Sequence, residues 1–139
     1  MAAAAPAEPQ GAGPLWRARQ LLDQELERGR RRLAQGLPVR AARLAHLRLT
    51  QDALEQIDRG HLRRASDLLE RAIAADGETG FAYLYLGKLY LDRGLTEEGL
   101  LLLERAAALL PRDRELEREL RRLRAQAGES LTEPARSGG

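Results

Sequence analysis

The chain has 139 residues, a net charge of +2 and no cysteine, and 43% of its residues are hydrophobic although only 4% are aromatic. This length suits one small domain, and the lack of cysteine excludes disulfides, thiolate metal sites and thiol nucleophiles. A core made mainly of Leu and Ala favours helices.

The predicted elements are helices joined by short connectors. Residues 1–13 are rich in Ala, Pro and Gly and predict a disordered tail. Hydrophobic periodicity predicts helices over residues 14–35, 39–59, 62–75, 79–93, 96–110 and 114–126. Residues 127–139 predict a second loop or disordered tail. The expected fold class is all-α, with antiparallel neighbours and no convincing strand.

Short signals mark the helix boundaries. Thr96 and Asp113 are suited to N-cap the last two helices, and Glu97 and Glu98 favour the first turn that follows Thr96. The residues expected to end helices are Gly36, Gly60, Gly94 and Pro111.

The stretch GFAYLYLGKLY, residues 80–90, contains every tyrosine and the only phenylalanine of the chain. Its alternation resembles a strand, but a helix explains it as two superimposed stripes. One stripe contains Tyr83, Leu86, Gly87 and Tyr90, and a roughly opposite one contains Phe81, Leu84, Tyr85 and Lys88. A helix that is apolar on two sides is either buried on both or presents one side to a partner.

The chain also matches itself at a shift of 34 residues. DRG at 58–60 recurs at 92–94, LLERA at 68–72 recurs at 102–106, and Ala74 recurs as Ala108. A 34-residue period with helix–turn–helix content is typical of a tetratricopeptide (TPR) array.

The residues themselves resemble the TPR family, with one repeat over 46–79, a second over 80–113 and a capping helix over 114–126. In the first repeat Gln56 and Gly77 replace the family's Tyr and closing Pro. In the second, Gly99 replaces the usual Ala, so it indicates either unusually close packing or a local weakness. The repeat signature comprises Tyr83, Leu86, Gly87, Tyr90, Gly94, Gly99, Leu103, Ala106 and Pro111.

This resemblance implies a right-handed superhelix of antiparallel helix pairs, an α-solenoid, whose concave groove binds a peptide or helix of another protein. Such a protein is a non-catalytic adaptor or scaffold. The implied groove residues are Leu47, Thr50, Gln51, Leu54, Ile57, Phe81, Leu84, Tyr85, Lys88, Leu91, Glu115, Arg118 and Arg122. The alternative is that another part of this chain, the N-terminal helix or a tail, fills the groove. The family's clamp for acidic C-terminal peptides is not supported, because Thr50, Leu54 and Leu84 occupy positions that need Lys or Asn.

The helix over 14–35 does not fit the repeat, and residues 14–45 are therefore treated as a separate N-terminal unit. We expect this extra helix to fold back as a cap on the next helix, with a dimerisation helix, and hence a homodimeric structural subunit, as the alternative. Trp16 is compatible with both roles.

Basic residues concentrate near the N-terminus, since residues 1–48 carry nine Arg and four acids (+5) and the remainder carries 14 basic and 17 acidic residues (−3). The segment RGRRRLAQG with Arg17, Arg19, Arg40 and Arg43 is the best hint of nucleic-acid or anionic-membrane binding. It lacks interleaved aromatics, and acids at 23, 25 and 27 interrupt it. Solvated charges on helix faces explain this basic segment equally well. Nucleic-acid or membrane binding therefore remains the less favoured interpretation, and protein binding the favoured one.

No catalytic chemistry or cofactor is predicted. The histidines, His46 and His61, have no metal-ligand spacing, and Ser66, Ser130 and Ser137 have no nucleophile context. The N-terminus lacks a basic signal-peptide region and no apolar run reaches membrane-span length, so a cytoplasmic location is expected. Small proteins of the resembled family are common in bacteria and many are exported or lipid-anchored, which leaves a removed leader as the alternative.

Overall fold

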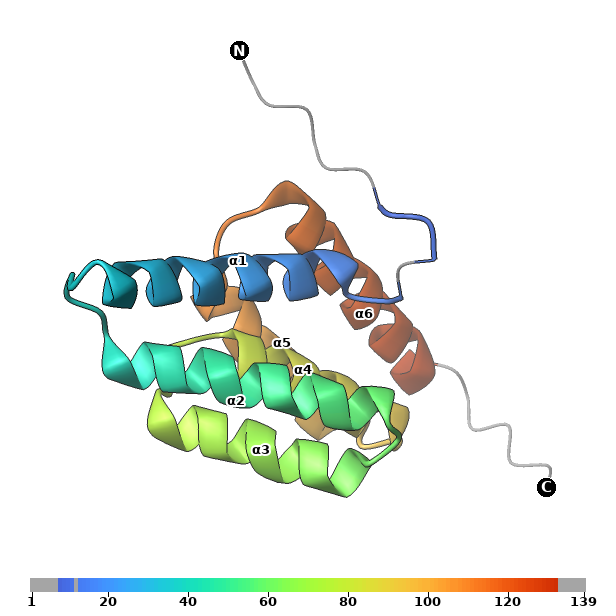
Figure 1. Cartoon of the computed structure of the whole chain (residues 1–139). Coiled ribbons are helices and arrows are strands. Elements are labelled where there is room, and N and C mark those ends of the chain that lie inside the picture. Colours follow the sequence, from blue (N-terminus) through green and yellow to red (C-terminus); the bar gives the residue numbers. More distant parts are fainter. Residues whose placement is uncertain (1–7, 12, 133–139) are drawn as a thin grey trace, which may run out of the picture.

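The computed structural model describes residues 8–11 and 13–132 and contains six helices within them. These are α1 (Trp16–Ala34), α2 (Ala41–Asp58), α3 (Leu62–Ala75), α4 (Phe81–Asp92), α5 (Thr96–Leu109) and α6 (Arg114–Thr132), shown in Figure 1. The all-α prediction is confirmed. Residues 1–7, 12 and 133–139, which make up much of the two predicted tails, lie outside the described part.

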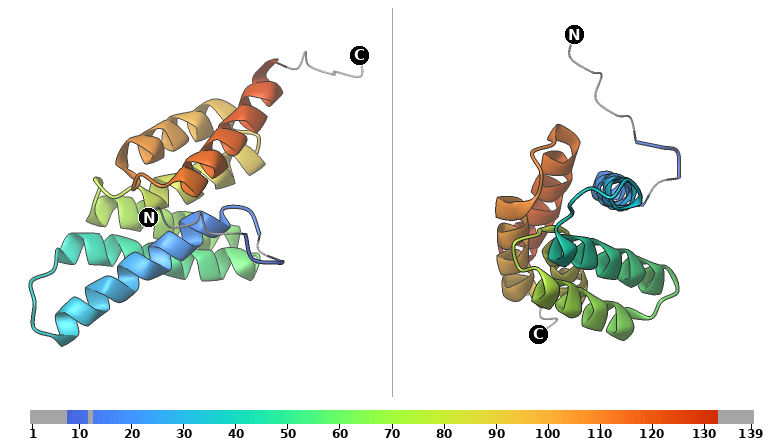
Figure 2. Two further views of the ribbon diagram at one scale, coloured as in Figure 1. Left: turned by 90° about the horizontal axis from the view of Figure 1, so that it is seen from above. Right: turned by 60° about the vertical axis from the view of Figure 1, so that its left-hand side comes forward.

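The helices pack mostly in sequence order. The closest associations are within the hairpins α2–α3 and α4–α5, and α3 then packs on α4 and α5 on α6. Helix α1 departs from this order, because it contacts both α2 and α6. Figures 1 and 2 show it lying along α2 with its N-terminal end beside α6.

The 34-residue repeat is visible in the hydrogen bonds of the two hairpins. At the end of α2 the amide of His61 donates to the Gln56 carbonyl at 2.8 Å, and at the end of α4 the amide of Leu95 donates to the Tyr90 carbonyl at 2.9 Å. Both turns place a glycine at positive φ, 78° in one and 81° in the other. Such a C-cap satisfies the last carbonyls of a helix and favours glycine, so it explains the repeated DRG.

Inside the second hairpin, two glycines allow the backbones of α4 and α5 to approach closely. A Cβ added to Gly87 would lie 3.1 Å from the Gly99 carbonyl oxygen, and one added to Gly99 would lie 2.7 Å from Leu91 Cδ2. Leu103 and Ala106 are fully buried in the same layer. Of the two interpretations of Gly99, close packing is therefore the one that the structure supports.

Most predicted helix ends lie within two residues of the observed ones, but the start of α5 and the end of α6 need correction. Thr96 is the first residue of α5 rather than its cap, and Leu95 at the cap position makes no side-chain capping bond. Helix α6 continues to Thr132, past the predicted end at residue 126. Gly128 costs about 1 kcal/mol relative to Ala but does not stop a helix by itself. Asp113 does cap α6, with its Oδ1 accepting from the Leu116 amide at 2.9 Å.

A buried histidine joins three helices near the start of the repeats. His46 on α2 has no exposed surface, and its Nε2 accepts a hydrogen bond from the Ala82 amide at 3.1 Å. Nδ1 therefore carries the proton and donates toward the carbonyls of Asp76 at 2.9 Å and Ala72 at 3.0 Å. Burial lowers the pKa of His46 and keeps the ring neutral. No sequence pattern indicated this role of His46.

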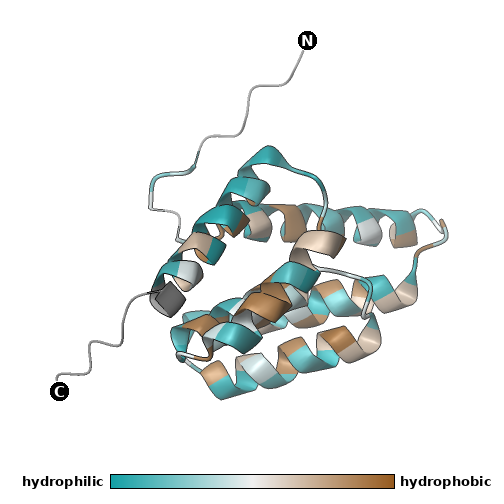
Figure 3. Cartoon of the chain, turned by 180° about the vertical axis from the view of Figure 1, so that it is seen from behind, coloured by the Kyte–Doolittle hydropathy of each residue, from teal (hydrophilic) through white to brown (hydrophobic). Residues whose placement is uncertain are grey.

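The hydrophobic core is continuous from α1 to α6. Its fully buried side chains include Leu22 and Leu26 of α1, Leu69 of α3, Phe81 of α4 and Leu116 of α6. Seen from behind in Figure 3, α6 is mostly hydrophilic outside the narrow stripe that it turns to the core. That stripe contains Leu116, Leu120 and Leu123, as expected of a helix that ends the stack.

Candidate interaction groove

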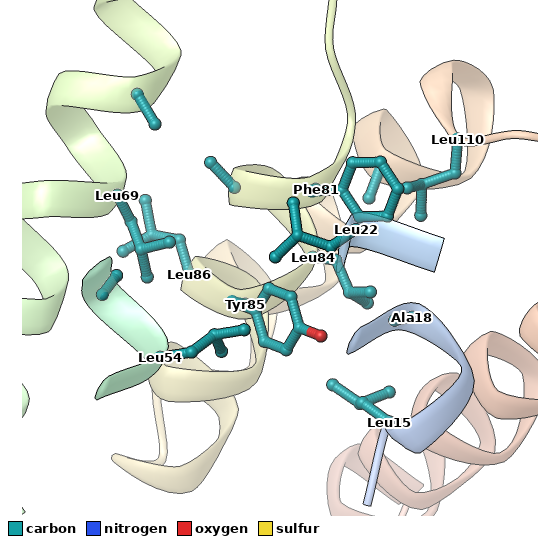
Figure 4. Close-up of a cluster of buried hydrophobic side chains, with 14 of the residues drawn as sticks. Leu15, Ala18, Leu22, Leu54, Leu69, Phe81, Leu84, Tyr85, Leu86 and Leu110 are labelled. Carbon is teal, nitrogen blue, oxygen red and sulfur yellow. The ribbon is translucent and has the colours of Figure 1, made fainter. Parts of the chain in front are cut away.

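The predicted groove corresponds to the surface formed by α2, α4 and the start of α6, and α1 covers it. Phe81 and Leu84 are fully buried and Tyr85 is 5% exposed. Figure 4 shows their side chains facing Ala18 and Leu22 of α1 and Leu15, the residue just before that helix. The chain therefore fills its own groove in this structure, as the alternative interpretation expects. Partner binding at these residues stays a prediction and requires that α1 moves away.

The residues that α2 contributes to the groove are covered in the same way. Leu47 and Leu54 are 3% and 5% exposed. Thr50 is fully buried, and its hydroxyl donates to the His46 carbonyl at 2.8 Å, so it is satisfied within its own helix. Gln51 is half-buried and its amide donates to Asp23 of α1 at 3.1 Å. These residues now contact α1 or the core rather than solvent.

α1 places a regular apolar stripe on this surface. Ala18, Leu22 and Leu26 recur at i, i+4 and i+8 and have no exposed surface. Asp23, Gln24 and Glu27 on the other side of the helix are exposed. This is the pattern of an amphipathic helix seated in a groove.

Tyr85 carries a polar atom that this arrangement leaves unsatisfied. Its hydroxyl is buried and has no hydrogen-bond partner among the described residues. Burial also raises the pKa of Tyr85, so the hydroxyl stays protonated. A buried, unsatisfied polar group costs about 1–3 kcal/mol. The packing of α1 on this surface therefore carries the cost of leaving the Tyr85 hydroxyl without a hydrogen bond.

The N-terminus of α1 is held by a carboxylate from α6. Glu119 accepts hydrogen bonds from the backbone amides of Arg17 at 3.1 Å and Ala18 at 3.0 Å. These amides belong to the first turn of α1, where helical partners are missing and a negative charge is favoured. Burial raises the pKa of Glu119, and the two amide bonds oppose that shift.

A second carboxylate, Asp113, ties the same end of α1 to α6. The Arg17 guanidinium donates to it from Nε at 3.1 Å and from Nη2 at 2.7 Å, and the two side chains are only 13% and 17% exposed. The hydrogen bond from Arg17 lowers the pKa of Asp113. Asp113 therefore both caps α6 and anchors α1.

Ion pairs hold α1 on α2. Arg19 pairs with Asp58 at 2.6 Å, and Arg43 pairs with Glu25 in a very short contact. Arg17, Arg19 and Arg43, which were part of the nucleic-acid hint in the sequence, are thus engaged with acidic residues of the chain.

The other predicted groove residues form a rim. Lys88 is bonded to Asp92 at 2.5 Å and Arg118 to Glu115 at 2.6 Å, within their own helices. Arg122 is exposed, and Leu91 is partly buried against Gly99. A cavity of about 160 Å³ remains beside Leu15 and Trp16, and Lys88 and Arg122 line it.

The repeat-signature residues take structural positions. Leu86, Gly87, Gly99, Leu103 and Ala106 are all buried. Gly87 lies against Gly99 and Leu103 where α4 and α5 meet, and Figure 4 shows Leu86 beside Leu69 of α3. Tyr83 is half-buried, with its hydroxyl donating to the Gly77 carbonyl at 2.9 Å and Arg105 stacked 6.0 Å from its ring centre. Tyr90 is also half-buried, Gly94 occupies the turn and Pro111 follows α5.

No protein-family model matches this chain, and no curated protein and no solved structure matches it. The class that the structure defines is therefore a six-helix all-α protein with mostly sequential packing. Within the described residues, no helix is both long and apolar enough to cross a membrane. The same residues contain no group of three or more His, Asp or Glu side chains placed to hold a metal ion.

Proposed function

We propose that the protein is a non-catalytic interaction module of the TPR type, which binds an amphipathic helix or peptide of another protein in the groove that α1 occupies. The right-handed superhelical arrangement of its helix pairs is part of this proposal. Two observations support it: the hairpins repeat their hydrogen bonds at a period of 34 residues, and signature residues fill the interior of the second hairpin.

The observation that carries the proposal is that α1, itself an amphipathic helix, is seated on Phe81, Leu84 and Tyr85. A surface that accepts one helix with apolar residues at i, i+4 and i+8 accepts others with the same spacing. The side chains involved are apolar, which suits recognition rather than catalysis.

A partner helix must compete with α1. The connector between α1 and α2 is short, residues 35–40, so α1 competes at an effective concentration on the order of millimolar. The unsatisfied Tyr85 hydroxyl weakens the closed state and favours exchange. A partner that offers this hydroxyl a polar group gains relative to α1.

A peptide of residues 14–36 tests whether the groove accepts a helix in trans. The full chain with Leu22→Glu and Leu26→Glu, which weakens its own α1, is expected to bind the unmodified labelled peptide. The unmodified chain should bind the same peptide at least tenfold more weakly. Fluorescence anisotropy measures both affinities.

Matched controls make the experiment decisive. A peptide with Leu22→Glu and Leu26→Glu should not bind, whereas Gln24→Glu and Arg30→Glu on the exposed side of α1 should leave binding unchanged. If circular dichroism shows the double Glu variant folded and it still ignores the peptide, the groove is not a helix-binding site. Sedimentation of the unmodified chain as a dimer that dissociates on the same two substitutions would instead support the self-associating subunit.

A further inference from the structure

A second cavity lies at the other end of α1, in the wedge between α1 and α2 next to their connector. Its volume is about 360 Å³, which is within the range of small-ligand sites. Residues of α1, the connector and α2 all line it. This end of the helix pair is opposite the Glu119 contact, as the course of α1 in Figure 2 shows.

The rim of this cavity is strongly basic. Four arginines, Arg28, Arg32, Arg40 and Arg43, line it against a single carboxylate, Glu25. Of the four, Arg43 is the one that pairs with Glu25, and it also donates to Thr79 at 3.2 Å. We refer to these five residues and the apolar floor beneath them as the arginine pocket.

The other three guanidiniums have unused hydrogen-bonding capacity. Arg28 has no hydrogen bond or ion pair within the described part of the chain. Arg32 uses only Nε, which donates to the Pro38 carbonyl at 3.0 Å and orients the group. Arg40 is 69% exposed and approaches Asp76 no closer than 3.7 Å. Guanidinium groups bind carboxylates and phosphates through paired N–H donors.

The floor of the arginine pocket is apolar. Gly29, Pro38, Val39, Leu44 and Leu47 contribute to its lining. Gly29 lets the Leu44 side chain pack against the backbone of α1, because a Cβ there would lie 2.8 Å from Leu44 Cδ1. A ligand at this site meets positive charge at the rim and hydrocarbon below it.

We propose that the arginine pocket binds a small amphiphilic anion, a carboxylate or phosphate group carried on a short apolar chain. The anionic group lies among Arg28, Arg32 and Arg40, and the chain lies on Val39, Leu44 and Leu47. The arginine pocket shares Leu47 with the predicted groove, but anion binding to its arginines does not require that the groove binds a partner.

Isothermal titration calorimetry on the full chain tests this with four probes, used below their micelle-forming concentrations. Octanoate and octyl phosphate carry both features, acetate lacks the chain and 1-octanol lacks the charge. Octanoate or octyl phosphate is expected to bind at least tenfold more tightly than acetate and octanol. Its affinity should fall as the salt concentration is raised. The tighter of the two identifies the anionic group.

The variant Arg28→Gln localises the binding. It is expected to weaken the preferred probe about tenfold, as the loss of one charge-assisted contact does. Its fold should persist because Arg28 makes no contact of this kind within the described residues. Arg63→Gln on the exposed face of α3 removes the same charge elsewhere and should change nothing. Binding of neither amphiphile, equal binding of octanol, or equal losses in the two variants would overturn the proposal.

Discussion

His46 offers the sharpest test of how the helices are joined. We consider His46→Phe, which keeps an aromatic ring in the buried site but removes both ring nitrogens. The Ala82 amide then loses its acceptor and the Asp76 carbonyl its donor. The Ala72 carbonyl stays satisfied, because it also accepts from the Asp76 amide at 3.0 Å. Leaving two buried polar groups without partners costs about 1–3 kcal/mol each, so the free energy of unfolding should fall by about 2–6 kcal/mol.

Urea denaturation followed by circular dichroism measures this loss. A small domain is typically stable by about 5–15 kcal/mol, so the effect is large enough to shift the midpoint clearly. His61 is the other histidine and is exposed, so His61→Phe serves as the matched control and should change stability by less than about 0.5 kcal/mol. A loss below about 1 kcal/mol in His46→Phe would refute the hydrogen-bond account.

The pH dependence follows from the same site. Burial lowers the pKa of His46 in the folded state, whereas in the unfolded chain it is near its ordinary value of about 6.5. Below that value the unfolded state binds more protons than the folded state, so stability falls as pH is lowered. The slope contributed by His46 approaches about 1.4 kcal/mol per pH unit and stops once pH passes the folded pKa. This pH dependence of the free energy of unfolding should be absent from His46→Phe and retained in His61→Phe.

Three further variants probe other contacts. Tyr85→Phe removes the unsatisfied hydroxyl and should raise the free energy of unfolding by about 1–3 kcal/mol in urea denaturation; a loss would mean that the hydroxyl is satisfied. Gly87→Ala should lower the melting temperature despite its helix preference, because the added Cβ lies 3.1 Å from the Gly99 carbonyl on the facing backbone; an unchanged or higher value contradicts this close packing. Asp113→Asn should cost about 1 kcal/mol by weakening the pair with Arg17. Arg17 lowers the pKa of Asp113, so the unmodified chain should lose the stability contributed by this pair as pH falls below the ordinary Asp pKa of about 3.8. An equal loss of stability in Asp113→Asn over the same pH range would contradict this assignment.

The sequence predicted those features that depend on neighbouring residues. The glycine C-caps at Gly60 and Gly94 were readable because a positive φ at the end of a helix selects glycine wherever it occurs. The two stripes of α4 were readable because helical periodicity assigns Leu86 and Leu84 to different faces without reference to other helices. Thr96 failed as a cap because Leu95 takes that position, and boundaries of this kind are uncertain by a residue or two.

The position of α1 could not be fixed in the same way. Its anchoring contacts join residues far apart in the chain: Arg17 and Asp113 are separated by 96 positions, and Ala18 and Glu119 by 101. An arginine in a helix is equally compatible with solvent, a neighbouring carboxylate or an anionic partner. Composition could therefore show an excess of arginine near the N-terminus but not which arginines are neutralised. The structure separates Arg17, which is paired, from Arg28, which is not.

The groove and the arginine pocket are linked because both depend on where α1 lies. The arginine pocket exists only while α1 rests on α2, since Arg28 and Arg32 come from one helix and Arg40 and Leu44 from the connector and the other. The groove is accessible only when α1 has left it. On the two proposals made above, an anion in the arginine pocket would stabilise the state in which α1 rests on α2, and a partner helix in the groove would stabilise a state in which α1 has left it. By thermodynamic reciprocity, each ligand must weaken the other by the same factor, so octanoate should lower the affinity of the unmodified chain for the peptide of residues 14–36.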